Sequence, residues 1–135
     1  MILKTYTRIF STDMNRTVEL LKQLHGREPH MRFVFGELEL VGIGDMLVVS
    51  GTDEALAPVR GSMGPWIVTD LDQAYDILID AGAEIVREIE TVPTGHMLYA
   101  RHPDGSVVEY VQWNDDLIER FVEAPRRDGT LSSQI

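Results

Sequence analysis

The order of predicted elements indicates an α+β fold built from two tandem β-α-β-β-β modules. In each half, a strand-like stretch leads into a helix cap and an amphipathic run, and three short apolar runs separated by turn residues follow. The halves also align in register, because Thr12-Asp13-Met14 and Thr69-Asp70-Leu71 are 57 residues apart. At 135 residues, the chain has the usual length of one domain.

The first module covers residues 1–50. Its first 11 residues are rich in β-formers, and Asp13 then provides a helix N-cap signal before an amphipathic run of Met14, Val18 and Leu21. Three short strands are predicted after this helix, at residues 31–35, 38–40 and 45–50.

Residues 51–61 contain Pro58 and have no strong period, which predicts a connector. The second module, residues 62–113, repeats the pattern, with Asp70 as the helix cap and Gly82 as the stop. Its strands are predicted at residues 63–69, 84–91, 96–101 and 106–113. Residues 114–135 are predicted to hold a short C-terminal helix, Asp115 to Glu123, and a frayed polar tail from Pro125.

The composition excludes several classes of function. The net charge of −10 lies almost entirely in residues 64–135, which hold 5 basic and 14 acidic groups, so we expect no nucleic-acid partner. No apolar run approaches the roughly 20 residues of a membrane span, and the N-terminal segment lacks a signal-peptide pattern, so we expect a cytoplasmic protein without a membrane partner. The absence of cysteine fits a reducing compartment and excludes thiolate chemistry.

The stretch PTGHMLYARHPDGSVVEYVQ, residues 93–112, lies at the end of the second of two matching halves. In that setting it resembles the glyoxalase, bleomycin-resistance and extradiol-dioxygenase superfamily, also called vicinal oxygen chelate proteins. The resemblance covers residues 1 to about 113. It implies paired β-α-β-β-β modules whose curled mixed sheets form a cleft, and it often implies a homodimer.

The resemblance also implies where a metal would bind, because metal-dependent members carry ligands near the start of each module's first strand and on each last strand. In this sequence the family spacing places Tyr6, Met63, Val48 or Val49, and Glu109 at those positions. Only Glu109 is an expected ligand. A divalent cation needs several hard or imidazole donors, so we expect no metal and no cofactor.

Strand alternation and the family register place one set of side chains on the cleft face, while Ile9 and Trp66 face the helices. We predict that this set binds the ligand: Tyr6, Arg8, Phe10, Met63, Ile67, Glu109, Val111 and Trp113. The trough is apolar and aromatic with two charges, which suits a flat ligand. Arg8 and Glu109 either orient that ligand or pair with each other across the sheet.

Other catalytic signatures are weak. The histidines, His25, His30, His96 and His102, share no ligand spacing, and the sequence contains no P-loop, dinucleotide fingerprint or nucleophile elbow. The sequence therefore predicts a metal-independent protein of the bleomycin-resistance type that sequesters or carries an aromatic small molecule or natural-product antibiotic. Two alternatives stay open: a divalent-metal lyase, isomerase or dioxygenase that uses Glu109, and a metal-free enzyme in which Tyr6 or Glu109 transfers protons.

Overall fold

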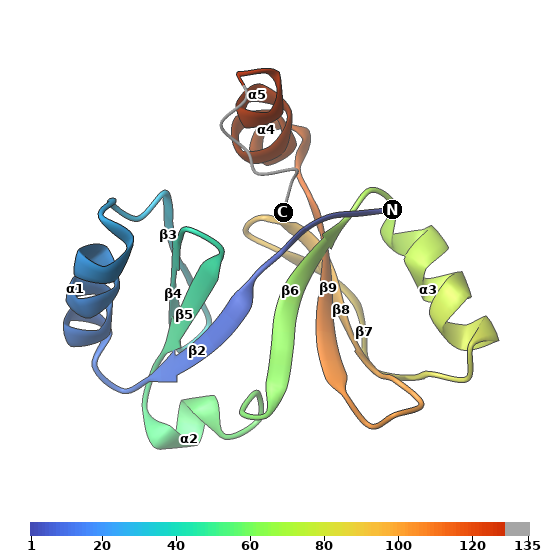
Figure 1. The fold of residues 1–135 in the computed structure, drawn as a ribbon. Coiled ribbons are helices and arrows are strands. Elements are labelled where there is room, and N and C mark those ends of the chain that lie inside the picture. Colours follow the sequence, from blue (N-terminus) through green and yellow to red (C-terminus); the bar gives the residue numbers. More distant parts are fainter. Residues whose placement is uncertain (129–135) are drawn as a thin grey trace.

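The computed structural model describes residues 1–128 and contains two mixed sheets (Figure 1). The five-stranded sheet has the order β1 (Ile2–Thr5), β6 (Ser62–Val68), β9 (Val107–Trp113), β8 (Gly95–Arg101) and β7 (Glu84–Val92). The four-stranded sheet has the order β2 (Thr7–Ser11), β5 (Met46–Ser50), β4 (Leu38–Ile43) and β3 (Met31–Phe35). The predicted α+β class with two strand-rich halves is confirmed.

One amphipathic helix covers the outer face of each sheet (Figure 1). Helix α1 (Met14–His25) begins at Asp13, whose carboxylate accepts a hydrogen bond from the amide of Arg16 at 3.2 Å. Helix α3 (Leu71–Asp80) begins in the same way at Asp70, which accepts from the amide of Gln73 at 3.0 Å. The duplicated caps confirm the predicted helix starts. No helix within residues 1–128 is long and apolar enough to cross a bilayer.

The hydrophobic core consists of three layers. One layer lies under α1, where Val18 and Leu21 pack on Val41 and Val48. Another lies under α3, where Ala74 and Leu78 pack on Leu98 and Val108. The third lies between the two sheets and contains buried side chains from both, among them Tyr6, Leu47, Ile67, Val111 and Trp113. This third layer places the inner faces of the sheets against each other, so a ligand site between them draws on both modules.

The predicted N-terminal strand is divided between the two sheets. Strand β1 pairs antiparallel with β6, whereas β2 pairs parallel with β5. At the junction, the amide of Tyr6 donates to the carbonyl of Pro65 in the five-stranded sheet at 3.1 Å, and the amide of Thr7 donates to the carbonyl of Asp45 in the turn between β4 and β5 at 2.8 Å. The chain therefore changes sheet at Tyr6, which the continuous β-forming composition of residues 1–11 does not reveal.

The connector and the C-terminal region contain more helix than the sequence predicts. A short helix, α2 (Asp53–Leu56), begins at Thr52, whose hydroxyl accepts from the amide of Ala55 at 3.1 Å. The C-terminal helix continues through α4 (Asp115–Ile118), a π-helical turn, η1 (Glu119–Glu123), and α5 (Ala124–Arg127). The predicted frayed tail is therefore wrong for residues 125–127, and residues 129–135 lie outside the described part of the chain.

Candidate functional site

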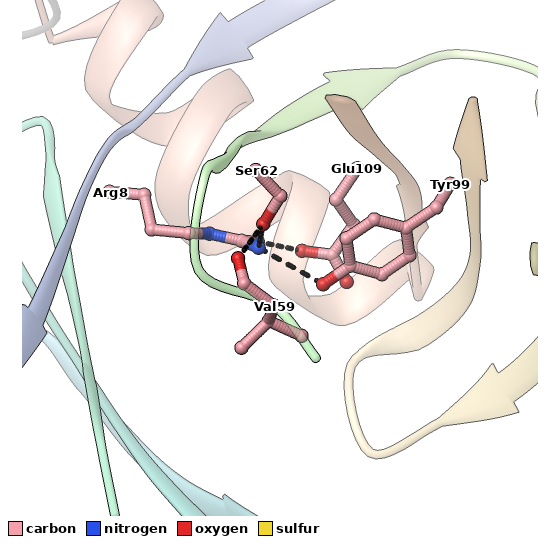
Figure 2. Close-up of polar contacts among 5 residues, drawn as sticks. All are labelled: Arg8, Val59, Ser62, Tyr99 and Glu109. Carbon is pink, nitrogen blue, oxygen red and sulfur yellow. Dashed lines mark hydrogen bonds and ion pairs between the residues drawn. The ribbon is translucent and has the colours of Figure 1, made fainter. Parts of the chain in front are cut away.

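A buried arginine connects the two sheets at the centre of the site (Figure 2). Arg8 extends from β2, and its Nη2 forms an ion pair with the carboxylate of Glu109 on β9. Its Nη1 donates to Ser62 Oγ at 2.9 Å and to Tyr99 Oη at 3.0 Å. The side chain of Arg8 is only 3% exposed and that of Glu109 is 15% exposed. The pair is therefore largely removed from water.

The charges in this network depend on one another. Burial raises the pKa of Glu109, and the positive charges of Arg8 and Arg87 act in the opposite direction. Burial also raises the pKa of Tyr99, with the negative charge of Glu109 adding to the effect. The Nε of Arg8 is buried and has no hydrogen-bond partner within residues 1–128. A buried donor of this kind needs an acceptor, such as a water molecule or a ligand oxygen.

Local backbone geometry sets the position of Glu109. Strand β6 has an irregular register between Met63 and Trp66 where it pairs with β9. Within this irregularity Gly64 has a φ of 113°, and a Cβ there would lie 2.8 Å from the carbonyl oxygen of Glu109. Only glycine allows so close a backbone approach. On the other side, the β8–β9 pairing places Tyr99 directly opposite Glu109.

An apolar cavity of about 50 Å³ lies between the sheets on one side of this network. Within residues 1–128, Glu109 is the one charged residue in its lining, and the other lining residues are Tyr6, Met31, Phe33, Phe35, Leu40, Leu47, Pro65, Val92, Thr94, Val111 and Trp113. The volume holds a small apolar group or a few water molecules. A larger ligand would place only part of its surface here.

A tyrosine–histidine pair lies at the edge of the cavity. The Tyr6 hydroxyl lies 2.9 Å from Nε2 of His30, and the two rings stack with centroids 6.0 Å apart. Burial lowers the pKa of His30 to about 4, and the positive charges of Lys4 and Arg27 contribute. Burial also raises the pKa of Tyr6. At neutral pH both groups are therefore uncharged, which suits an apolar site.

Comparisons with known proteins give the family. A sequence model described as the glyoxalase/bleomycin resistance protein/dioxygenase superfamily matches residues 67–110. An uncharacterized protein from Methanosarcina mazei is 36% identical, with 84% of this chain and 94% of that chain aligned and a TM-score of 0.79. The chain belongs to the glyoxalase/bleomycin resistance protein/dioxygenase superfamily. No curated protein sequence matches it significantly.

More distant solved structures share the fold of this superfamily member. Methylmalonyl-CoA epimerase from Mycobacterium tuberculosis is 16% identical, with 87% of this chain and 93% of that chain aligned and a TM-score of 0.69. A Streptomyces coelicolor methylmalonyl-CoA epimerase variant in complex with 2-nitronate-propionyl-CoA is 17% identical, with 85% and 97% aligned and a TM-score of 0.65. At these identities, the likeness concerns the fold alone.

The predicted site residues occupy different places in this superfamily fold. Tyr6, Glu109, Val111 and Trp113 line the apolar cavity, and Ile67 is buried in the layer between the sheets. Phe10 packs against that layer, while Ile9 packs under α1 and Trp66 under α3, as the strand alternation predicts. Met63 is 39% exposed and does not line the apolar cavity. A ligand-binding role for these residues remains a prediction.

The sequence prediction missed several residues of the site. Phe33 and its neighbours on β3 line the cavity, and the alternation in MRFVF, where Met31, Phe33 and Phe35 share one face, was the signal for them. Tyr99 could have been found by counting outward from the Pro-Asp-Gly turn, which pairs it with Glu109. No local signal connects His30 to Tyr6.

The donor set fits a divalent metal poorly. Of the positions that superfamily spacing marks as ligands, Met63 is exposed, and Val49, not Val48, faces the layer between the sheets. The carboxylate of Glu109 is held by Arg8. Within residues 1–128, no group of three or more histidine, aspartate and glutamate side chains is close enough together to hold an ion. A guanidinium and a single carboxylate offer too few donors.

Loss of Arg8 should destabilise the fold strongly. Because Arg8→Met leaves Glu109 buried without its counter-charge, we expect the free energy of unfolding to fall by about 3–5 kcal/mol. Arg8→Met combined with Glu109→Leu should recover much of that loss, since both charges are removed. Arg32→Gln breaks the exposed pair with Glu39, at 3.3 Å, and should cost less than about 1 kcal/mol. Urea unfolding measures all three, and a loss in Arg8→Met no larger than in Arg32→Gln would contradict the role of the pair.

Acid should destabilise the protein through His30. Its pKa is about 4 in the folded chain and ordinarily 6.5, so the unfolded chain binds the proton first as the pH falls. The contribution of His30 to stability is therefore present above pH 6.5 and lost as the pH falls from 6.5 to 4. We expect His30→Gln to flatten this part of the curve of unfolding free energy against pH. An unchanged slope in the variant would contradict the assignment.

Proposed function

We propose that this superfamily member is a metal-independent binding protein that sequesters or carries an aromatic small molecule, as in resistance to a natural-product antibiotic. The observation that carries the proposal is the buried ion pair between Arg8 and Glu109. In this pair, Arg8 occupies the carboxylate of Glu109, which is the one expected metal ligand.

The lining of the apolar cavity supports a flat, largely apolar ligand group. Aromatic rings reach it from both sheets, with Phe33 and Phe35 on β3, Tyr6 beside β2 and Trp113 on β9. Aromatic side chains contribute large contact areas and prefer stacked or edge-to-face partners. Trp113 already makes such contacts with Tyr6 and Phe121, at centroid distances of 6.2 and 5.9 Å. A ligand ring would extend this aromatic cluster.

The C-terminal helical segment supports the same proposal because it supplies part of the aromatic cluster next to the cavity. Phe121 of the π-helical turn packs on Trp113 and lies 5.0 Å from His30, measured between ring centroids. Val122 of the same turn is fully buried in the layer between the sheets. Because π-helical turns occur often at functional sites, this segment is suited to form one wall of a ligand site.

The alternative is a divalent-metal lyase, isomerase or dioxygenase. Two observations favour it: Glu109 lines the cavity, and the fold is shared with methylmalonyl-CoA epimerases, several of whose structures are described as complexes with 2-nitronate-propionyl-CoA or methylmalonyl-CoA. A metal at Glu109 would have to displace Arg8 and gather further donors. Because that displacement leaves a buried guanidinium unpaired, we rank this alternative second.

The cellular location, oligomeric state and partners that we propose are inferred from the sequence. We expect it to act in the cytoplasm as a homodimer, with no nucleic-acid partner because of its net charge of −10. Sedimentation at micromolar concentration measures the oligomeric state.

Binding of flat, neutral aromatic compounds should change the emission of Trp113. The chain has two tryptophans, and Trp66 packs under α3, outside the cavity lining. We therefore expect Trp66→Phe to keep the ligand response and Trp113→Phe to lose it. Phe33→Ala should weaken binding about 2- to 12-fold, because an aromatic pair contributes about 0.5–1.5 kcal/mol.

The same titration separates the two functions. A metal-independent protein should bind equally well with and without EDTA. If no compound of any class changes the emission of Trp113 in the Trp66→Phe protein, the proposed function is wrong. If binding requires a divalent cation, the enzyme alternative is favoured.

A further inference from the structure

A second cavity, on the other side of the Arg8 network, has a different character from the apolar one. It is a groove of about 440 Å³, within the range of small-molecule sites. Its lining comes from the segment after α2, from the start of β6 and from strands β7, β8 and β9: Pro58, Val59, Arg60, Gly61, Ser62, Val86, Arg87, Tyr99, Arg101 and Val107. We call this the arginine-lined groove.

The lining of the groove differs in composition from the chain as a whole. The chain has 12 basic and 22 acidic residues, whereas the lining within residues 1–128 has three arginines and no acidic residue. An acidic surface that only keeps the protein in solution gives no reason for cations to gather at one cavity. The three arginines come from separate parts of the chain, so the fold, not a local basic run, brings them together.

Neighbouring carboxylates position each of these arginines without saturating it. Arg60 contacts Asp53 at 3.2 Å, Arg101 contacts Glu84 at 2.5 Å, and Arg87 pairs with Glu90. Each contact uses one terminal nitrogen, and a guanidinium has five N–H donors. The side chains are between 45% and 47% exposed. They are therefore partly ordered, partly dehydrated and able to bind a second acceptor.

The hydroxyl of Tyr99 extends the donor set toward the buried network, whereas the hydroxyl proton of Ser62 is already donated to the carbonyl oxygen of Val59. Ser62 and Tyr99 line the groove, and both accept hydrogen bonds from Nη1 of Arg8. Because the phenolic oxygen of Tyr99 accepts from Arg8, its own proton can be donated to a ligand oxygen. Arg87 also links the two cavities, since its guanidinium lies 6.0 Å from the ring centroid of Phe35, which lines the apolar cavity.

We propose that the arginine-lined groove binds a phosphate or carboxylate group of a small-molecule ligand, held by Arg60, Arg87 and Arg101. Planar guanidinium groups match the oxygens of both anions in two-point contacts, which makes arginine suitable for this recognition. The proposal is independent of the proposed function, because the groove can take an anion whether or not the apolar cavity takes a ring.

Three compounds test the proposal on the full-length protein by isothermal titration calorimetry. Inorganic pyrophosphate tests for a free anion. 2-Naphthyl phosphate, compared with 2-naphthol, tests for an anionic group attached to a ring. We expect at least one phosphate compound to bind, and we expect Arg87→Gln and Arg101→Gln each to weaken it by about tenfold or more, as loss of a charged hydrogen bond does. If naphthyl phosphate binds more tightly than both pyrophosphate and naphthol, the groove binds an anionic group that is attached to a ring. If only pyrophosphate binds, the groove binds a free phosphate.

Arg32→Gln is the matched control. It removes the same charge from a half-exposed ion pair with Glu39 on the four-stranded sheet, outside the groove lining, and should leave binding unchanged. Thermal unfolding checks that all variants fold. The proposal is overturned if pyrophosphate does not bind and naphthyl phosphate binds no better than naphthol, or if Arg32→Gln weakens binding as much as Arg87→Gln. Failure of naphthol to bind concerns the proposed function alone.

Discussion

The ion pair between Arg8 and Glu109 is the interaction on which the site depends. Neither charge is stable alone in this interior, because each would lose its hydration without a partner. Since Arg8 lies on the four-stranded sheet and Glu109 on the five-stranded sheet, the pair also fixes the two sheets relative to each other. The hydroxyls of Ser62 and Tyr99 accept hydrogen bonds from the other terminal nitrogen of the guanidinium. The carboxylate of Glu109 is thus paired with a cationic side chain of the same chain.

The same network contributes residues to two chemically distinct cavities. Glu109 lies in the lining of the apolar cavity, and Ser62 and Tyr99 lie in the lining of the arginine-lined groove. Aromatic and aliphatic side chains dominate the lining of the first cavity, and three arginines contribute to the lining of the second. A ligand with a flat apolar group and an anionic group would match both, and the two cavities meet where Arg87 packs near Phe35.

The sequence predicted the fold better than the site, for physical reasons. Helix caps at Asp13 and Asp70 and the alternation of the strands are local signals, and the duplicated order gave the two modules. The switch of the chain at Tyr6 depends on hydrogen bonds to residues far away in sequence, so local composition could not show it. Strand alternation correctly placed Arg8 and Glu109 on the same face but left open whether they pair. The irregular register at Gly64 separates Met63 from Ile67, which an ideal strand of period two does not allow for.

Metal content measures the central claim most directly. The protein should be equilibrated separately with Zn²⁺, Ni²⁺, Mn²⁺ and Fe²⁺, desalted without chelator, and analysed for each element beside the Glu109→Gln variant. If Arg8 holds Glu109 as described, wild type and variant should retain the same substoichiometric amount of every metal. One ion bound per wild-type chain and lost in Glu109→Gln would contradict the account.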